Sequence, residues 1–205
     1  PEVIVPELPE DPADFVKALS ELNLFESTSF SEADADRAKM YSEEAARKLS
    51  QQNFPTPEEY LKSLEMKVVL DRFDAFNLPR ISQLIQRSNQ FNLMTRRFNE
   101  AECESFMKDE QGRLPFYIKL RDKYGDSGLI SVVILKFEKE AARIEEWIMS
   151  CRVLCRGVEQ YAMNFAVSAA KKRGLGKIIG RYVPTDKNKM VKEFYGQFGF
   201  KKIEE

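Results

Sequence analysis

The stretch EEWIMSCRVLCRGVEQYAMNFAVSAA, residues 145–170, decides the fold, because it reads as a strand that turns at once into a helix. Strand-forming side chains fill residues 144–149, and a short loop, residues 150–156, follows them. The helix opens at Gly157, repeats its apolar residues every three or four positions, and ends at Gly174 after three basic residues. Such a turn aims backbone N–H groups and the positive end of the helix dipole at one spot, which suits a phosphate or pyrophosphate.

The loop carries one candidate nucleophile and several candidate phosphate ligands. Cys151 lies at a strand end, beside a helix N-terminus and between Arg152 and Arg156, a setting that favours a reactive thiolate. An inert buried cysteine is the alternative for Cys151, and solvated loop charge is the alternative for the arginines. A guanidinium pairs bidentately with phosphate, whereas loop amides bind it without any side chain. The predicted phosphate-binding set is therefore Arg152, Leu154, Cys155, Arg156, Gly157 and Val158.

Length and composition limit the possible classes of protein. A chain of 205 residues that is 43% hydrophobic can bury one substantial core and a smaller appended piece. Its 32 basic and 33 acidic residues give a net charge of −1, which argues against nucleic acid as a partner. No apolar run approaches the roughly 20 residues of a membrane span, so no membrane partner is expected.

Histidine is absent from the sequence, and cysteine is scarce. The first absence removes the commonest general base and zinc ligand, so a Ser–His–Asp or Cys–His machine within this chain is excluded, and no metal site is expected. Three cysteines are too few for a disulfide framework and fit a reducing cytoplasm. Cys103 and Cys155 are expected to pack inside the fold. The chain begins at Pro1 without a signal peptide, so a fragment or processed form is expected.

Residues 1–65 predict a helical arm. A short strand at residues 3–5 is followed by a helix capped by Asp11, and Ser31 opens a longer, charged helix with a thin apolar stripe. Thr56, with Pro57 and Glu59 after it, carries the features of a helix start.

Residues 66–205 predict an α/β domain with a partly antiparallel sheet. The helix that Asn99 caps and the half-buried strand at 115–121 are typical of such a domain. The expected strands are 66–73, 115–121, 128–137 (central), 141–149, 177–183 and 200–203, and the other expected helices are 80–89, 157–173 and 185–197.

The order from residue 79 onward resembles the GCN5-related N-acetyltransferase fold. The Q/R-x-x-G-x-G/A signature of that fold corresponds here to residues 152–157, with Cys155 in place of the first glycine. Asn188, Phe194-Tyr195 and Gly199-Phe200 resemble its later N…FY…GF element. The resemblance implies a mixed, mostly antiparallel sheet flanked by helices and a site for pantetheine.

A second resemblance covers essentially the whole chain. RISQLIQRSNQFNLMTRRF, DKYGDSGLISVVI, EEWIMSCRVLCRGVE and YVPTDKNKMVKEFYGQFGF look like the C-terminal half of FkbH-like proteins. In that family a haloacid dehalogenase-type phosphatase domain precedes this half. The family passes a glyceryl group from 1,3-bisphosphoglycerate through an enzyme thiol to the phosphopantetheine of an acyl carrier protein. The magnesium-binding loop of the phosphatase domain is absent from this sequence, so no metal is expected.

The resemblance assigns roles to individual residues. Cys151 would carry the acyl group, while Asn188 and Tyr195 would face the thioester, where a tyrosine can protonate a leaving thiolate. A core aromatic role is the alternative for Tyr195. From the residues alone, Asp126 is a candidate base, although turn aspartates are usually structural. The polar, irregular residues 89–97 either cap structure or bind substrate through Asn92, Thr95 and Arg96.

The sequence is also compatible with two other functions. The chain can be an N-acetyltransferase that uses acetyl-coenzyme A, in which Cys151 is idle, or a non-catalytic module that docks the carrier protein.

Overall fold

The computed structural model describes residues 6–22 and 32–203 and divides the chain into two compact units, Pro1–Glu44 and Ala45–Glu205. The first unit holds a 3-10 turn, Pro12–Asp14, then α1, Phe15–Glu21, and most of α2, Glu32–Gln51. The Asp11 side chain caps this turn by accepting the Ala13 amide at 2.9 Å, as predicted. The predicted strand at residues 3–5 lies outside the described residues. The division at residue 65 stays a prediction.

The second unit is built on a six-stranded sheet in the order β1-β3-β4-β5-β2, with β6 paired to β5 off this path. All pairs are antiparallel except β5 with β6, which confirms the mixed sheet and the central place of β4. The strands are β1, Lys67–Arg72; β2, Phe91–Asn92; β3, Arg113–Asp122; β4, Gly125–Phe137; β5, Ala142–Met149; and β6, Ile178–Ile179.

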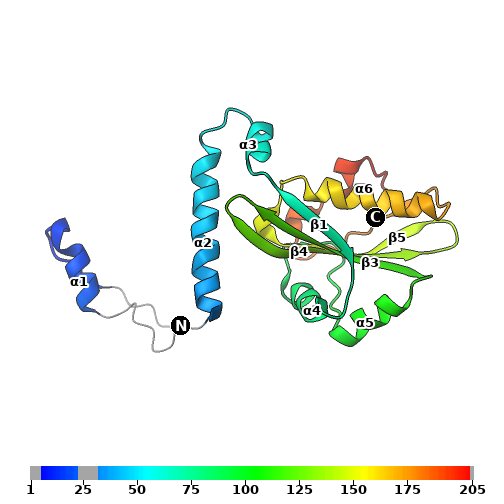
Figure 1. The fold of residues 1–205 in the computed structure, drawn as a ribbon, viewed down its shortest axis with the longest axis horizontal. Helices are drawn as coiled ribbons and strands as arrows, with labels where there is room; N and C mark the ends of the chain where they lie inside the picture. The colour runs from blue at the N-terminus through cyan, green and yellow to red at the C-terminus, as the bar shows by residue number, and fades with distance from the viewer. Residues whose placement is uncertain (1–5, 23–31, 204–205) are drawn as a thin grey trace. The chain divides into compact units, whose positions relative to one another are not determined.

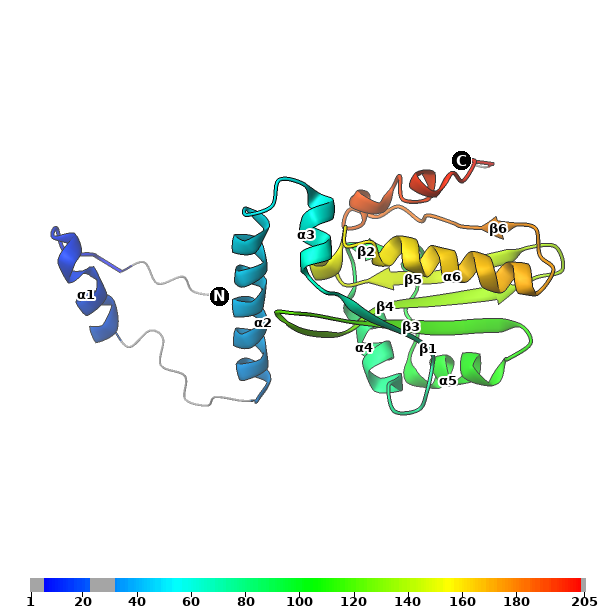
Figure 2. The same cartoon turned by 45° about the horizontal axis from the view of Figure 1, so that its top comes forward.

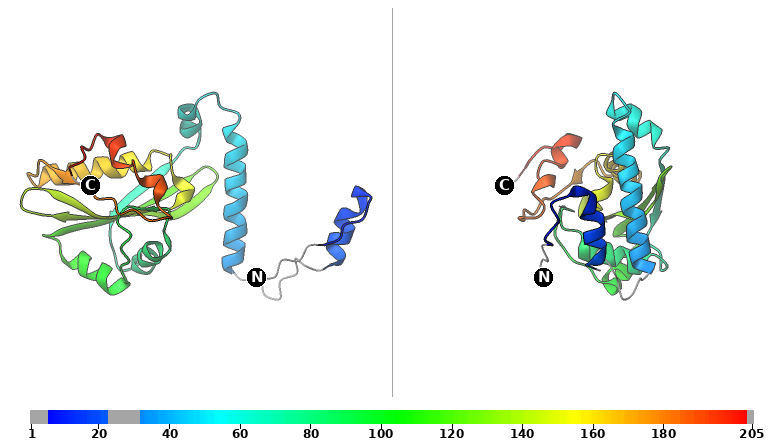
Figure 3. Two further views of the ribbon diagram at one scale, coloured as in Figure 1. Left: turned by 180° about the vertical axis from the view of Figure 1, so that it is seen from behind. Right: turned by 90° about the vertical axis from the view of Figure 1, so that its left-hand side faces the viewer.

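Helices cover both faces of this sheet (Figure 1). On one face α6, Val158–Lys172, buries Ala162 and Ala166 against Phe116 and Trp147. On the other face α4, Leu78–Arg87, and α5, Glu100–Lys108, pack on β3, β4 and β5. The view from behind shows the same two layers of helix around the sheet (Figure 3). Because both faces are covered, β3 is buried on both sides at Phe116, Tyr117 and Ile118 rather than half-buried as predicted.

Two helices start at the residues that were expected to cap them, while the expected cap Ser31 lies outside the described residues. Thr56 accepts the Glu59 amide at the start of α3, Pro57–Ser63. Asn99 and Glu102 form a reciprocal capping box on α5, in which each side chain accepts the other residue's amide.

The C-terminal segment differs from the sequence prediction. β6 is two residues long instead of seven, and the predicted helix at 185–197 is replaced by two 3-10 turns, Lys189–Val191 and Tyr195–Phe198. Residues 200–203 form no strand. The cause is visible at Asn188, whose buried side chain binds the Thr185 amide and the Val183 carbonyl and so holds the backbone in a non-helical path.

No helix within residues 6–22 and 32–203 has the length and apolar character needed to cross a membrane.

Candidate functional site

The strand–loop–helix predicted at the centre of the sequence is present as β5, a 3-10 turn at Cys151–Val153, and α6. Gly157 is the N-cap of α6 and has φ 79°, a left-handed conformation that glycine adopts without strain. Cys155 also has a left-handed backbone, with φ 60°, although it carries a Cβ. The glycine that the resemblance expects at this position therefore matches a conformation that the cysteine adopts at a cost.

One loop amide already has an acidic partner. The backbone N–H of Cys155 donates a 2.8 Å hydrogen bond to Oε1 of Glu159, in the first turn of α6. This carboxylate lies where the helix N-terminus favours negative charge. An incoming phosphate must therefore use the other loop amides or compete with Glu159 for this one.

The three cysteines fall into two environments. Cys151 and Cys155 are exposed, so the inert-core alternative for Cys151 and the expected packing of Cys155 are both wrong. Cys103 is buried on α5 as predicted. Burial raises the pKa of the Cys103 thiol to about 12, and the charges of Glu102 and Glu100 add to the effect. Cys151 is thus the accessible thiol at the end of β5.

The two loop arginines point to different surroundings. Arg152 is exposed, and its Nε lies 3.4 Å from the Ser150 hydroxyl. The Arg156 side chain is only 10% exposed, and its guanidinium binds the Asp122 carboxylate at 3.3 Å and the Arg152 carbonyl at 2.9 Å. Of the two, Arg152 is the more exposed.

The hairpin that joins β3 to β4 meets the loop through Asp122. The Ser150 amide donates to the Ile130 carbonyl, so this hairpin runs alongside the loop. Asp126, the predicted base, is exposed and accepts the Gly128 amide at 2.7 Å, an ordinary turn contact. Sequence reasoning missed Asp122, whose place two residues before Tyr124-Gly125 is a turn signal but carries no sign of a contact with the loop.

A second polar cluster lies midway along β5, at a bulge. Ile134 pairs with Glu146 while Leu135 pairs with Ile144, so Glu145 is an extra residue in the strand. Glu145 faces Arg96 and Arg113, with N–O distances of 3.2 and 2.8 Å.

Glu146 is fully buried beside this bulge and was not singled out from the sequence. Its carboxylate accepts the amides of Trp147 at 3.0 Å and Arg96 at 3.2 Å. Burial raises the pKa of Glu146 to about 7, while hydrogen bonds from the amides of Trp147, Met94 and Arg96 act to lower it. A carboxyl that titrates near neutrality is a functional-site candidate.

Tyr195 packs at the same cluster. Its hydroxyl oxygen is buried without a hydrogen-bond partner in the described part of the chain. Burial raises the pKa of Tyr195 far above its usual value, and the charge of Glu146 raises it further. Its ring lies so close to Gly180 that a Cβ there would overlap the ring atoms Cε1 and Cζ. Tyr195 is therefore held as a packed aromatic whose polar end faces the Glu146 region.

The remaining predicted residues mostly bond to the protein itself. Asn92 and Asn188 are fully buried, and the Asn188 Nδ2 donates to the Asn92 carbonyl at 2.9 Å. The Asn92 Oδ1 accepts the Thr95 amide at 2.6 Å, and Thr95 has φ 59°, unusual for a β-branched residue. Arg96 is half-exposed beside Glu145 and Phe98. The substrate roles of these residues stay predictions, with Thr95 and Arg96 the more accessible.

Two regions of potential chemistry are thus separated along β5. Glu146, near Tyr195, lies three residues before Met149, which is about 10 Å of strand, and Cys151 lies beyond Met149. Between them β2 covers the edge of β5, since Phe91 pairs with Met149 and the Leu93 amide donates to the Trp147 carbonyl (Figure 2).

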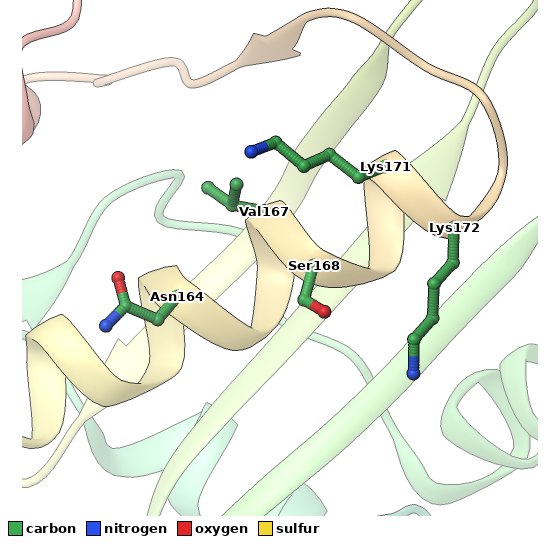
Figure 4. A pocket seen from close by; sticks show the side chains of 5 residues that line it. All are labelled: Asn164, Val167, Ser168, Lys171 and Lys172. Carbon is green, nitrogen blue, oxygen red and sulfur yellow. The ribbon is translucent and has the colours of Figure 1, made fainter.

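A shallow cavity of about 520 Å³ lies on the outer side of α6, away from both regions. Figure 4 shows the side chains that line it, Asn164, Val167, Ser168, Lys171 and Lys172. Among the described residues, no group of three or more acidic or cysteine side chains is arranged to hold a metal ion.

The strained backbone of the loop makes a first prediction. Cys155→Gly is expected to raise the free energy of unfolding, by up to about 1 kcal/mol, because a left-handed conformation costs a side-chain-bearing residue roughly that much. Gly157→Ala is expected to lower it by a similar amount, although nothing lies within 4 Å of the added Cβ. Urea denaturation of both variants measures the change in the free energy of unfolding. Changes of the same sign in the two variants would contradict the assignment of strain to Cys155.

Glu146 makes a second prediction, on pH dependence. Its pKa is raised from 4.5 to about 7 in the folded state, so its stabilising contribution is fully present below pH 4.5 and is lost as the pH rises through 7. At 1.36 kcal/mol per pKa unit the loss approaches ~3 kcal/mol. Urea denaturation at pH 5 and pH 8 is expected to show a larger decline in wild type than in Glu146→Gln. Equal declines in the two proteins contradict the assignment.

Comparison with solved structures shows which fold this is. The ribosomal-protein-S18-alanine N-acetyltransferase from Escherichia coli aligns with a TM-score of 0.50 and 14% identity over 67% of this chain and 80% of its own. Glucosamine-6-phosphate N-acetyltransferase from Arabidopsis thaliana gives 0.50 and 15% over 68% and 95%. AAC(6')-Iy, solved in complex with the bisubstrate analog CoA-S-monomethyl-acetylneamine, gives 0.53 and 11% over 68% and 94%.

The chain therefore has the fold of N-acetyltransferases, which confirms the predicted fold class. A scan of protein-family models gives no match, and neither does a search of curated protein sequences.

Proposed function

We propose that this chain is an acyltransferase that moves a glyceryl group, through a thioester on Cys151, to the phosphopantetheine thiol of an acyl carrier protein. The observation that carries the proposal is the exposed thiol of Cys151 at the end of β5, directly before the loop that opens α6. An exposed thiol beside a helix N-terminus and Arg152 meets the physical requirements of a nucleophile and of phosphate binding at one place. The choice of a glyceryl group rests on the resemblance of four sequence blocks to FkbH-like proteins.

The chemistry divides into two displacements. The Cys151 thiolate attacks the acyl-phosphate carbonyl of 1,3-bisphosphoglycerate, a C–S bond forms, the C–O bond to phosphate breaks, and phosphate leaves. The pantetheine thiol then attacks the thioester carbonyl, the bond to Cys151 breaks, and the thiol proton passes to the departing Cys151 sulfur. In this scheme a phosphatase-like domain, attached N-terminally or acting separately, removes the remaining phosphate.

The loop residues fit a phosphodiester better than a larger anion. Arg152 is exposed, and Gly157 leaves space above the start of α6, both of which favour an anion. The bond between Glu159 and the Cys155 amide opposes extra negative charge at the same point. Pantetheine on a carrier has a single phosphodiester, whereas coenzyme A adds a pyrophosphate and a further phosphate.

The cover of β2 on β5 favours chemistry at Cys151 over chemistry inside the sheet. A pantetheine arm that paired with the edge of β5 between Trp147 and Met149 would have to displace Phe91 and Leu93. An arm that ends at Cys151 meets no such obstacle. In this scheme Asp126 and Tyr195 take no part in the first displacement.

A second candidate is an N-acetyltransferase that uses acetyl-coenzyme A. The fold favours it, because solved N-acetyltransferase structures align with this chain, and one of them is a complex with a coenzyme A analog. Glu146, with its pKa near 7, and Tyr195 are the acid–base candidates in that case. A third reading, a docking module without catalysis, uses the same loop for binding alone.

Intact-protein mass separates these candidates. The protein is incubated with a synthetic glyceryl thioester, or with 1,3-bisphosphoglycerate when its phosphatase partner is present. A glyceryl adduct that disappears in Cys151→Ser but persists in Cys155→Ser supports glyceryl transfer. If the protein acetylates amines and Cys151→Ser keeps this activity, the second candidate is supported. If neither the glyceryl adduct nor an acetylated amine forms, only the docking function remains.

A further inference from the structure

A buried arginine in α2 binds the hairpin that contacts the loop. The side chain of Arg47 is 5% exposed, and its Nε lies 2.7 Å from Oδ2 of Asp122. Its Nη2 lies 2.9 Å from Oδ1 of the same carboxylate, so the pair is bidentate. Charged side chains this deeply buried are rare and are paired where they occur.

Asp122 joins three elements. It accepts both Arg47 hydrogen bonds, the amides of Tyr124 and Gly125 at 2.9 and 3.1 Å, and the guanidinium of Arg156 at 3.3 Å. Burial raises the pKa of Asp122, but the hydrogen bonds from Arg47 and the two turn amides outweigh it and keep the pKa below its usual value. The carboxylate is therefore charged at neutral pH.

Arg156 passes this contact on to the loop backbone. Its Nη1 binds Asp122, and its Nη2 donates to the Arg152 carbonyl at 2.9 Å. The path thus runs from α2 through the hairpin to the carbonyl of Arg152, next to Cys151. We name these three side chains, Arg47, Asp122 and Arg156, the loop brace.

The end of α2 is itself fixed to this part of the fold. The Tyr60 hydroxyl in α3 donates to the Arg47 carbonyl at 3.3 Å. The amide of Lys123, next to Asp122, donates to the carbonyl of the fully buried Leu64 at 3.0 Å. Arg47 therefore projects from a fixed backbone toward a fixed turn, as a positioning residue requires.

We propose that Arg47 is a positioning residue for the phosphate-binding loop, acting through Asp122 and Arg156, so that the C-terminal turns of α2 control the geometry of the loop. The proposal rests on the proposed function in treating this loop as the phosphate site. This role of Arg47 makes α2 more than a linker. It also explains why Arg156 faces inward, although an arginine in this loop could otherwise bind phosphate.

The test compares Arg47→Ala with Lys48→Ala, which removes the same charge from the exposed neighbour in α2. Arg47→Lys keeps the charge without the bidentate geometry and serves if the alanine variant does not fold. Hydrogen exchange is followed in peptides that cover residues 150–158 and, as an internal standard, β4. The affinity for 4′-phosphopantetheine is measured calorimetrically on the same proteins.

In Arg47→Ala, the hydrogen-exchange rate of residues 150–158 is expected to rise by about tenfold while the amides of β4 keep their protection. The reason is that the loop opens locally more often, without global unfolding. The affinity of Arg47→Ala for 4′-phosphopantetheine is expected to fall by about fivefold or more. Arg47→Lys is expected to lie between Arg47→Ala and wild type, and Lys48→Ala is expected to match wild type. Exchange in the loop that stays within twofold of wild type, or that quickens only in step with β4, overturns the proposal. If wild type binds no 4′-phosphopantetheine, the phosphate role of the loop fails, and the exchange comparison still decides whether the brace exists.

Discussion

Replacing Asp122 with asparagine is expected to lower the free energy of unfolding by about 3–5 kcal/mol, because the change removes a buried carboxylate that two buried guanidinium groups bind. Arg47 and Arg156 are 5% and 10% exposed in their side chains, and Asp122 is 1% exposed, so solvent cannot replace the lost charge. Asparagine still accepts the turn amides, so the turn itself is preserved. Urea denaturation at neutral pH measures the loss.

The matched control is Asp126→Asn in the same hairpin. Asp126 is exposed and bonds only the Gly128 amide among the described contacts, so its replacement is expected to cost less than about 1 kcal/mol. The cost of Asp122→Asn is expected to fall by half or more in an Arg47→Met background. Equal losses in the free energy of unfolding for the two asparagine variants would show that the Asp122 ion pairs stabilise the fold no more than the exposed turn contact of Asp126 does.

Gly180→Ala is expected to cost about 1–3 kcal/mol and to displace the Tyr195 ring, the cost typical of overpacking a core. The added Cβ would overlap the ring atoms Cε1 and Cζ of Tyr195, and this ring is also packed against Phe194 and Phe200, at centroid distances of 5.6 and 5.1 Å. Urea denaturation and the fluorescence of Trp147, which packs on Phe194, report the change.

Gly176→Ala is the control for this substitution, since no atom lies within 4 Å of its added Cβ. In a Tyr195→Ala background the cost of Gly180→Ala is expected to vanish, because the overlapping ring is gone. A cost that persists in that background would place the strain in the backbone at residue 180 instead.

Local signals in the sequence predicted most of the sheet and its helices. The start of α6 at Gly157 and the capping box at Asn99 depend on neighbours within four residues, so residue types alone specify them. The C-terminal segment was predicted wrongly as a helix because its conformation depends on Asn188, whose amide binds the carbonyl of Asn92, 96 residues away. No local pattern reports such a contact.

The same distinction applies to the candidate site. The place of Cys151 was predictable, because it follows from a strand, a turn and a helix in succession. The inward path of Arg156 was not, because its partner Asp122 lies 34 residues earlier and was indistinguishable from other turn aspartates. Glu146 was missed because a glutamate in a strand usually faces solvent, and only the bulge at Glu145 turns it inward.

The loop before α6 is expected to bind the pantetheine phosphate, with Cys151 at its edge. The most direct measurement is a titration of the ¹⁵N-labelled protein with 4′-phosphopantetheine, followed by amide chemical shifts, with pantetheine that lacks the phosphate as control. With 4′-phosphopantetheine, the largest chemical-shift changes are expected at the amides of Leu154, Arg156, Gly157 and Val158. Pantetheine is expected to cause much smaller changes at the same amides. Shifts confined to other parts of the sheet, or equal shifts with both ligands, would contradict this expectation.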